Sequence, residues 1–375
     1  MADKKILILG GYGETGRRLS DHLIKRNGVD VLIVGRNESR ALEFAAEMNE
    51  KYPGNHATGI ACDIVKADSL QNLMNGVDFF IQAGPALPVD VIHKLAQAVL
   101  DAGADWMDVQ LDPKQAAVLE KYDSRMKKEG RCFATQGGFH PGLPAAFVRW
   151  AASRVDKITD AFVGGFINPE EGLILTSGVD ELIDLFSDYN PKVYKNGGWI
   201  ETGLKMSEMR KFNFGFGIGE QTMTPMSLDE MIPLPEMFPS LNNTGFYVGG
   251  FDWVTNWITT PLMMVGIKLF PKVKANTWGR LMCWSHKTFN RPPYGTCLKL
   301  EAEGIKVGKK AKVELSLIHS DEYELTAIPM VSVIEQMLNG SAHKPGLIRM
   351  ALLTDPEKIL LDMQEMGCKI EENIF

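Results

Sequence analysis

The stretch that decides the fold is KILILGGYGETGRRLSDHLIKRNGVDVLIVGRN, residues 5–37. An apolar run ends at Leu9, glycines follow at once, a helix-like segment comes next, and a second apolar run begins at Val29. This order of strand, glycine-rich turn, helix and strand is the context in which the spacing Gly-x-Gly-x-x-Gly binds a dinucleotide. The stretch therefore predicts a dinucleotide-binding βαβ unit.

The same alternation of apolar runs and helix-like segments continues through residue 135. Several runs, such as VLIV and FFI, are apolar throughout, which is typical of parallel strands covered on both faces. The pattern predicts an α/β fold, a Rossmann-type doubly wound parallel sheet. The expected strands are Lys5–Leu9, Val29–Val34, Thr58–Cys62, Asp78–Gln82, Trp106–Val109 and Arg131–Thr135, and the expected helices are Thr15–Arg26, Glu38–Lys51, Ala67–Met74, Val89–Ala102 and Pro113–Glu129.

The pattern changes after Gly137 and predicts a following α+β domain with an antiparallel sheet. Residues 298–319 alternate apolar and polar residues on either side of a turn, which indicates a hairpin. The run YELTAIP, residues 323–329, is a candidate third strand, and helices are expected at 332–338 and 355–366. We expect a nucleotide domain at 1–137 and a substrate or dimerisation domain at 138–340. The helical segment at 341–375 could pack on either domain, and we expect it to pack on the first.

Composition excludes several classes of protein. The 375 residues carry 40 Lys+Arg and 47 Asp+Glu, a net charge of −7, with no basic run that would follow a phosphate backbone, so no nucleic-acid partner is expected. The five cysteines show neither disulfide nor metal-ligand spacing. Reduced thiols and the absence of a signal-peptide pattern at the start predict a cytoplasmic protein.

The glycines of the motif have separate expected tasks. Gly11 allows the tight turn, Gly13 lets a pyrophosphate approach the backbone, and Gly16 lets the helix pack close to the strand. Asp63 after the third strand is expected either to meet the adenine or to cap a helix. The expected cofactor-binding residues are Gly11, Tyr12, Gly13, Glu14, Thr15, Gly16, Arg36, Asn37, Asp63, Ala83, Gly84 and Pro85.

The end of the second expected strand predicts which cofactor binds. A site specific for NAD carries an acid about 20 residues after the motif, whereas a guanidinium suits the 2′-phosphate of NADP. Here the position holds Arg36, and Glu38 is the competing interpretation. We therefore expect NADP, with NAD as the alternative.

Four stretches resemble the saccharopine dehydrogenase-like family of NAD(P)-binding oxidoreductases. They are LILGGYGETGRRL with VLIVGRN; FFIQAGP with AGADWMDV; GGFHPGLPAAFV; and the end of the chain from LKLEAEGIKVGKK to DPEKILLDMQEMG. The resemblance implies a Rossmann domain with an inserted α+β domain, and hydride transfer at a carbon–nitrogen bond. Residues from about 170 to 293 depart from the family's pattern, so the resemblance leaves the substrate open.

Two residues are candidates for the chemistry. His140 lies on the turn after the sixth expected strand, where an imidazole can move a proton, although a structural role is the alternative. Asp108 ends the fifth expected strand and is expected to face the cleft and hold a cationic amine, and Asp112 is expected to cap a helix. No set of residues has metal-ligand spacing, so no metal is expected.

Three functions remain open at this stage. The first is an NADP-dependent oxidoreductase acting on an amine or imine of a small molecule. The second is a carbonyl or enoyl reductase with a more apolar substrate, and the third is a regulatory protein that binds the cofactor without turnover. The uncharged run Trp253–Ile267 is too short to span a membrane, and we expect a homodimer interface there rather than contact with a membrane surface.

Overall fold

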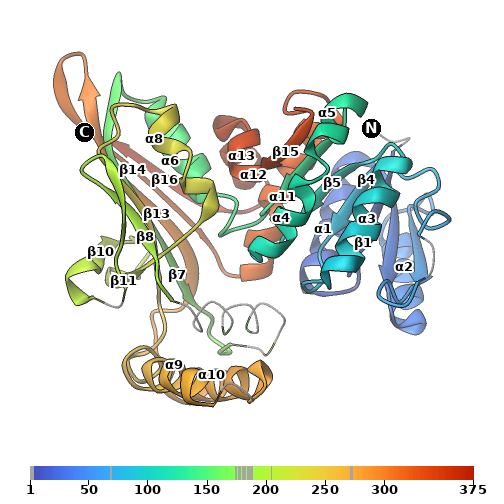
Figure 1. Ribbon diagram of the computed structural model, residues 1–375, viewed down its shortest axis with the longest axis horizontal. Helices are drawn as coiled ribbons and strands as arrows, with labels where there is room; N and C mark the ends of the chain where they lie inside the picture. Colours follow the sequence, from blue (N-terminus) through green and yellow to red (C-terminus); the bar gives the residue numbers. More distant parts are fainter. Residues whose placement is uncertain are drawn as a thin grey trace. The chain divides into compact units, whose positions relative to one another are not determined.

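The computed structural model describes residues 4–67, 70–173, 175, 179, 183, 189–203, 205–270 and 273–375. The chain divides into two compact units (Figure 1). Unit 1 comprises Met1–Leu143 and Tyr323–Met366, and unit 2 comprises Pro144–Glu322 and Gly367–Phe375. These boundaries differ from those expected at 137 and 340, because the chain returns to unit 1 at Tyr323, where a long helix begins.

Unit 1 contains a seven-stranded sheet in the order β15-β6-β5-β4-β1-β2-β3, with every pair parallel. The chain starts at the centre of the sheet, passes to one edge and then builds the other half, which is the order of a Rossmann-type sheet. The strands are β1 (Lys5–Leu9), β2 (Asp30–Gly35), β3 (Ala57–Ala61), β4 (Phe79–Gln82), β5 (Asp105–Asp108), β6 (Cys132–Thr135) and β15 (Gly346–Arg349). The predicted α/β fold is confirmed.

Up to residue 129, the helices of unit 1 agree with the prediction except at two places. The helices are α1 (Glu14–Asn27), α2 (Glu38–Lys51), α3 (Val89–Asp101), α4 (Pro113–Glu120), α5 (Asp123–Glu129), α11 (Glu322–Leu338), α12 (Met350–Leu353) and α13 (Pro356–Glu365). The single helix expected at Pro113–Glu129 is interrupted at Lys121 and Tyr122 and forms α4 and α5.

The helix expected at Ala67–Met74 is wrong for the residues that the structure describes. Residues 71–76 form turns, with one helical bond from the Met74 N–H to the Leu70 carbonyl at 3.0 Å. Gly76 then takes a left-handed φ of 69° and ends the turn. Asp68 and Ser69, inside the expected helix, lie outside the described residues.

One face of the unit 1 sheet is covered by α3 and α4. Leu7, Phe80, Trp106 and Phe133 point to this face from four strands and are fully buried, and Leu95 on α3 packs against them. The Trp106 ring is tilted against the Phe80 ring and stacked on the Phe133 ring, with ring centroids 4.5 and 5.5 Å away. This packing fixes the strands whose carboxyl ends carry the candidate site.

Unit 2 is built on a nine-stranded mixed sheet. Its main path is β10-β11-β12-β7-β13-β14-β16, and β8 pairs with β12 and β9. All pairs are antiparallel except β12 with β7. The strands are β7 (Lys157–Asn168), β8 (Lys192–Lys195), β9 (Gly198–Glu201), β10 (Arg210–Asn213), β11 (Glu220–Met226), β12 (Asn243–Gly249), β13 (Gly295–Lys306), β14 (Lys309–His319) and β16 (Lys369–Ile374).

The hairpin expected at 298–319 is confirmed as β13 and β14, but the strand expected at 323–329 is wrong. Those residues open α11, a helix in which Leu325, Ala327 and Ile328 are fully buried. Pro329 lies inside this helix, where a proline removes one backbone hydrogen bond. The alternation over seven residues was too short to distinguish a strand from a helix buried on nearly all sides.

The remaining helical segments belong to unit 2. They are α6 (Pro144–Ala152), η1 (Met206–Glu208), η2 (Asp229–Met231), α8 (Leu234–Met237), the π-helical turn η3 (Thr255–Thr259), α9 (Thr260–Leu269) and α10 (Ala275–Phe289). In Figure 1, α9 and α10 lie side by side beyond one end of the sheet of this unit. Within the described residues, no helix has both the length and the apolar content that crossing a membrane requires.

Candidate nucleotide-binding site

The glycine-rich loop joins β1 to α1 at the carboxyl edge of the unit 1 sheet. The Gly10 and Gly11 N–H groups both donate to the Val34 carbonyl, at 2.8 and 3.3 Å, so the loop starts against β2. Gly13 is the N-cap of α1 and has no side chain that could accept from the first turn. A Cβ on Gly13 would meet only the Gly10 carbonyl oxygen, at 3.1 Å. Gly13 therefore leaves open space beside the positive end of a 14-residue helix, which suits an anion.

The other loop glycines face protein. A Cβ on Gly16 would lie 2.3 Å from the Gly10 oxygen, and a Cβ on Gly11 would lie 2.9 Å from the Ile8 oxygen. Gly10 has a left-handed φ of 83°, and a Cβ there would lie 2.8 Å from the Gly84 Cα. Gly10 thus performs the tight turn expected of Gly11, whereas the close packing expected of Gly16 matches the structure.

Tyr12 connects the loop to the end of β2. Its hydroxyl accepts a hydrogen bond from the Asn37 N–H at 2.9 Å, and its ring covers Gly35, where a Cβ would lie 2.3 Å from a ring carbon. The Arg40 guanidinium lies 4.8 Å from the centre of the same ring. The tyrosine therefore holds the glycine loop, the β2 end and the first turn of α2 together.

The residues after β2 place positive charge at the start of α2. Asn37 is the N-cap, and its side chain accepts from the Arg40 N–H at 3.0 Å. Arg36 is exposed and makes no hydrogen bond or ion pair with any residue that the structure describes. Glu38 is the first residue of α2 and is exposed as well. Two guanidiniums and a helix N-terminus thus lie at this strand end.

Glu14 and Thr15 open α1. Glu14 is exposed, and its carboxylate accepts from Arg18 at 2.9 Å one turn further along the helix. Thr15 is half-buried. A hydroxyl and two backbone N–H groups beside Gly13 are suitable partners for a phosphate oxygen.

The segment after β4 is fixed by a chain of buried glutamines. The Ala83 N–H donates to the Leu9 carbonyl at 2.9 Å, which places Ala83–Pro85 beside the glycine loop. The Gln110 amide donates to the Gly84 carbonyl at 2.8 Å, and the Gln115 amide donates to Gln82 at 2.9 Å. All three glutamines are at most 1% exposed. Sequence reasoning missed this framework.

Asp63 begins a turn after β3. Its side chain accepts weakly from the Val65 N–H at 3.3 Å and pairs with Lys66 at 3.2 Å, and its carbonyl accepts from the Lys66 and Ala67 N–H groups. The preceding Cys62 N–H donates to the Gly35 carbonyl at 2.9 Å, so Asp63 stays near the β2 end. The structure therefore gives Asp63 a capping role in a turn, and contact with adenine stays a prediction.

Asp108 is an interior carboxylate. It is 0% exposed and accepts from Trp106 Nε1 at 2.7 Å, the Thr135 hydroxyl at 2.9 Å and the Gln110 N–H at 3.0 Å. Burial raises the pKa of Asp108, and these hydrogen bonds oppose the shift. The structure does not place Asp108 where a substrate amine would reach it, because the protein itself surrounds and satisfies the carboxylate. Asp112 caps α4 as expected, accepting from the Lys114 N–H at 2.8 Å.

His140 lies in the loop that follows β6. The loop is tightly folded, since a Cβ on Gly142 would lie 2.4 Å from the Gly138 oxygen. His140 is half-buried as a residue, its Nε2 atom is buried, and the centre of its ring lies 4.5 Å from that of the Phe139 ring. Burial lowers the pKa of His140 to about 4, so the imidazole is neutral near pH 7. A neutral imidazole can donate or accept a hydrogen bond, but it is a weak base.

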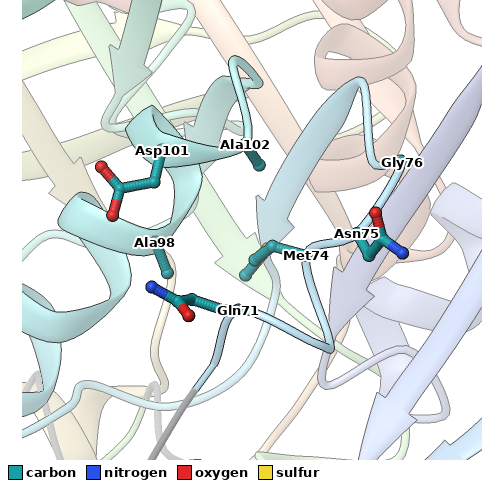
Figure 2. Close-up of a pocket in the computed structure, with 7 residues that line it drawn as sticks. All are labelled: Gln71, Met74, Asn75, Gly76, Ala98, Asp101 and Ala102. Carbon is teal, nitrogen blue, oxygen red and sulfur yellow. The ribbon is translucent and has the colours of Figure 1, made fainter.

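A pocket elsewhere in unit 1 lies outside the candidate site. Figure 2 shows its lining, which comes from the turn before β4 and the end of α3, and its volume is about 380 Å³. These segments lie at the amino edge of the sheet, opposite the glycine loop. No group of three His, Cys, Asp or Glu side chains suited to a metal occurs among the described residues. The pocket is lined by Gln71, Met74, Asn75, Gly76, Ala98, Asp101 and Ala102.

Arg40 is the main site residue that sequence reasoning missed. A usable signal was present, because Arg40 falls in the first turn of the helix expected from Glu38, close in sequence to Arg36. The contact between Arg40 and Tyr12 required the structure, since the two residues come from different loops.

Known proteins resemble this chain in two ways. The family model of short chain dehydrogenases matches residues 4–98, about a quarter of the chain, which contain the glycine loop and the first four strands. No curated protein sequence matches the chain.

Among solved structures, saccharopine dehydrogenase (L-Glu forming) from Saccharomyces cerevisiae is similar with a TM-score of 0.69. The two chains share 13% identity, and the match covers 99% of this chain and 100% of the other. DAP dehydrogenase from C. glutamicum is matched with a TM-score of 0.48, 15% identity and coverage of 98% and 100%. The chain thus has the two-unit fold of saccharopine dehydrogenase over its whole length, and the resemblance predicted from the sequence is confirmed at the level of the fold.

Proposed function

We propose that the protein is an NADP-dependent oxidoreductase that transfers a hydride at a carbon–nitrogen bond of a small molecule. The observation that carries the proposal is the carboxyl edge of the unit 1 sheet. There, an open glycine loop at a helix N-terminus adjoins two arginines at the end of β2. The match to the short chain dehydrogenase model over this same part of the chain supports it.

The residues of the loop fit the pyrophosphate of a dinucleotide. Gly13 leaves room for the phosphates, and the N–H groups of the first turn of α1 point toward that room. Gly84 lies against Gly10, so Ala83–Pro85 would border the bound cofactor on the side of β4. Gly10, Gly11 and Gly16 have no room for a Cβ within the protein, whereas at Gly13 a Cβ would enter the space proposed for the pyrophosphate.

Three features favour NADP over NAD. Arg36 is exposed and has no partner among the described residues, Arg40 is held over Tyr12, and the N-terminus of α2 points to the same region. A 2′-phosphate there would gain charge-assisted hydrogen bonds, typically worth ~1.5–3 kcal/mol. Glu38 could instead accept a hydrogen bond from a ribose hydroxyl, as in a site for NAD. However, two arginines and a helix N-terminus lie beside Glu38, and they favour a bound phosphate there.

The chemistry at a carbon–nitrogen bond is proposed from the fold. Saccharopine dehydrogenase (L-Glu forming), whose fold is similar with a TM-score of 0.69, is a dehydrogenase that forms L-Glu. The family resemblance in the sequence implies hydride transfer at a carbon–nitrogen bond. When bound, the nicotinamide supplies or accepts the hydride. In this proposal, His140 contacts the reacting group as a neutral imidazole and accepts a proton from it, and its low pKa limits it to a short-lived protonated state.

The compartment is part of the proposal as well. None of the five cysteines, all within the described residues, forms a disulfide. Reduced thiols support a cytoplasmic location for the catalytic units.

Cofactor binding is tested by titrating the purified protein with NADPH and NADH and following fluorescence. We expect NADPH to bind roughly ten- to hundredfold more tightly, since 1.4 kcal/mol is about tenfold. Arg36→Ala and Arg40→Ala should each remove a large part of the preference and leave NADH binding nearly unchanged. Lys128→Ala is the matched control, because Lys128 is exposed at the end of α5, next to the amino edge of the sheet. Equal affinities for the two cofactors in the wild-type protein would overturn the assignment of NADP.

Turnover is tested by NADPH consumption with imines formed from amino and keto acids, and separately with ketones and enoyl compounds. Consumption with the first panel supports the proposal. Consumption only with the second panel would assign the protein as a carbonyl or enoyl reductase. Tight NADPH binding without consumption in either panel would assign a regulatory role.

A further inference from the structure

An exposed apolar surface lies on the helical hairpin of unit 2. Of the 22 large hydrophobic residues exposed in the described part of the chain, ten fall within residues 253–284. On α9, Leu262, Val265 and Leu269 are 65, 56 and 67% exposed and recur every three or four residues, so they form one stripe. On α10, Leu281 and Trp284 are 37 and 58% exposed and are three residues apart. We call the surface formed by these five residues together with the exposed Trp253 and Trp257 the hairpin patch. Figure 1 shows α9 and α10, which carry most of it, side by side.

The opposite sides of the same helices are packed, which fixes the direction of the patch. Met263 and Met282 are fully buried in one cluster. Gly266 admits the Trp278 ring, since a Cβ on Gly266 would lie 2.4 Å from a ring carbon. The Ser285 hydroxyl bonds the Thr259 hydroxyl at 2.7 Å, which ties α10 to the π-helical turn. The hairpin is therefore a built element with a specific interior, and its outer apolar side chains are not simply core residues left uncovered by poor packing.

The charge of this segment is opposite to that of the rest of the chain. Residues 253–289 contain five Lys or Arg and no Asp or Glu, whereas the other residues contain 35 Lys or Arg and 47 Asp or Glu. Lys268 and Arg280, both exposed, accompany the apolar stripes on α9 and α10. The nearest preceding acid, Asp252, accepts from the Thr255 N–H at 2.9 Å and so caps the helix start.

We propose that the hairpin patch docks the protein onto the surface of an anionic lipid bilayer. Apolar side chains would enter the boundary between headgroups and acyl chains, and the basic residues would meet the lipid phosphates. Trp253, Trp257 and Trp284 are 67, 41 and 58% exposed, and tryptophan is enriched at exactly such interfaces between water and lipid. The basic residues beside the apolar side chains therefore favour an anionic membrane as the partner of the hairpin patch.

A second copy of the chain fits the same surface less well. A twofold dimer apposes identical patches, so the exposed Lys268 and Arg280 of one copy would approach those of the other, and residues 253–289 contain no acid to pair with them. The homodimer expected from the sequence stays a prediction, and it is the competing outcome of the experiment.

The experiment is flotation of the purified full chain with phosphatidylcholine vesicles that contain or lack phosphatidylserine. We expect binding to vesicles with phosphatidylserine, weaker binding as salt rises, and little binding to neutral vesicles. Leu262→Glu should abolish binding, whereas Met206→Glu, which changes a 75% exposed residue elsewhere in unit 2, should not. Replacing Lys268 and Arg280 by Gln should lower the partition coefficient about fivefold for each residue. The matched control replaces the exposed Lys306 and Lys310 by Gln.

Two results would overturn the proposal. One is that the wild-type protein remains free in the presence of phosphatidylserine vesicles. The other is that Leu262→Glu floats as well as the wild-type protein. If sedimentation shows a wild-type dimer that Leu262→Glu converts to a monomer, and no vesicle binds, the patch is a subunit interface instead. All variants change exposed side chains, so thermal unfolding should be unaltered and serves as the check on folding.

Discussion

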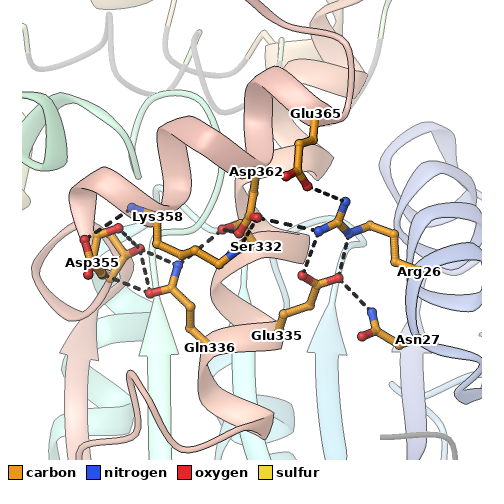
Figure 3. A network of polar contacts seen from close by, with 10 residues as sticks. Arg26, Asn27, Ser332, Glu335, Gln336, Asp355, Lys358, Asp362 and Glu365 are labelled. Carbon is orange, nitrogen blue, oxygen red and sulfur yellow. Dashed lines mark hydrogen bonds and ion pairs between the residues drawn. The ribbon is translucent and has the colours of Figure 1, made fainter.

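Arg26 joins the first helix of the chain to the segment that returns to unit 1 near the C-terminus, and its removal makes a quantitative prediction. Figure 3 shows its contacts: Arg26 donates to both oxygens of Glu335, at 2.7 and 3.1 Å, and lies 3.6 Å from Asp362. The Glu335 side chain is 10% exposed and Asp362 is 0% exposed. The substitution Arg26→Met would keep the packing of the stem and leave the Glu335 carboxylate without its cation, whereas Asp362 would keep its ion pair with Lys358.

The expected cost follows from this burial. Removing one partner of a buried ion pair costs ~3–5 kcal/mol, since the other charge stays out of water. Arg26 is itself 23% exposed, and Asn27 still donates to Glu335 at 2.8 Å, so we expect the lower end, about 3 kcal/mol. A double variant, Arg26→Met with Glu335→Met, should be less destabilised than Arg26→Met alone.

The assay is urea unfolding followed by circular dichroism. Arg125→Met is the matched control, because Arg125 also contacts two acids, Asp101 at 2.7 Å and Glu129 at 2.8 Å, but all three side chains are 35–48% exposed. Such a surface pair is worth ~0–1 kcal/mol. Equal losses for Arg26→Met and Arg125→Met would refute the reasoning, because burial would then make no difference to the pair.

Three further predictions concern the candidate site. Gly16→Ala should destabilise the fold by ~1–3 kcal/mol, because its Cβ would meet the Gly10 oxygen at 2.3 Å, whereas Gly13→Ala should keep the melting temperature and weaken NADPH binding in a fluorescence titration. His140 has a pKa lowered to about 4 from an ordinary 6.5, so the unfolded chain binds its proton first on acidification, and roughly 3 kcal/mol of stability should be lost as the pH falls from 6.5 through 4. His140→Gln should flatten that part of the profile of unfolding free energy against pH. Asp108→Asn should cost ~2–4 kcal/mol in urea unfolding, because an amide group would face the Trp106 and Thr135 donors, and an unchanged stability would contradict the structural role of Asp108.

The first half of unit 1 was predictable because its signals are local. Strands such as Phe79–Gln82 are wholly buried, so every residue is apolar or satisfied within the sheet, and the expected range was correct within one residue. Two of the loop glycines are required by contacts within a few residues, namely Gly16 with Gly10 and Gly11 with Ile8. Where a residue and the contact that requires it lie close together in the chain, both can be recognised in the sequence.

The return of the chain to unit 1 could not be predicted in this way. The strand β15 has four residues, and nothing local to Gly346–Arg349 distinguishes it from a loop. It forms because β6 offers an open edge, to which it adds in parallel from about 210 residues further along the chain. The buried helix α11 is similarly defined by the surface it covers, as its contact with Arg26 illustrates. Such elements depend on partners that are distant in sequence.

The two candidate catalytic residues explain why a position at the sheet edge is not enough to assign chemistry. Asp108 and His140 both follow parallel strands of unit 1, and the sequence gives both the same expected location. The structure separates them by their surroundings: four groups donate to the Asp108 carboxylate, counting the Gln136 N–H at 3.3 Å, and Asp108 is fully buried, whereas His140 is half-buried as a residue. A carboxylate whose acceptor sites are filled by the protein has little left for a substrate. The two candidates are thus distinguished by the number of hydrogen-bond donors that neighbouring strands supply to each side chain. That number depends on strand register and burial, and a sequence motif does not reveal it.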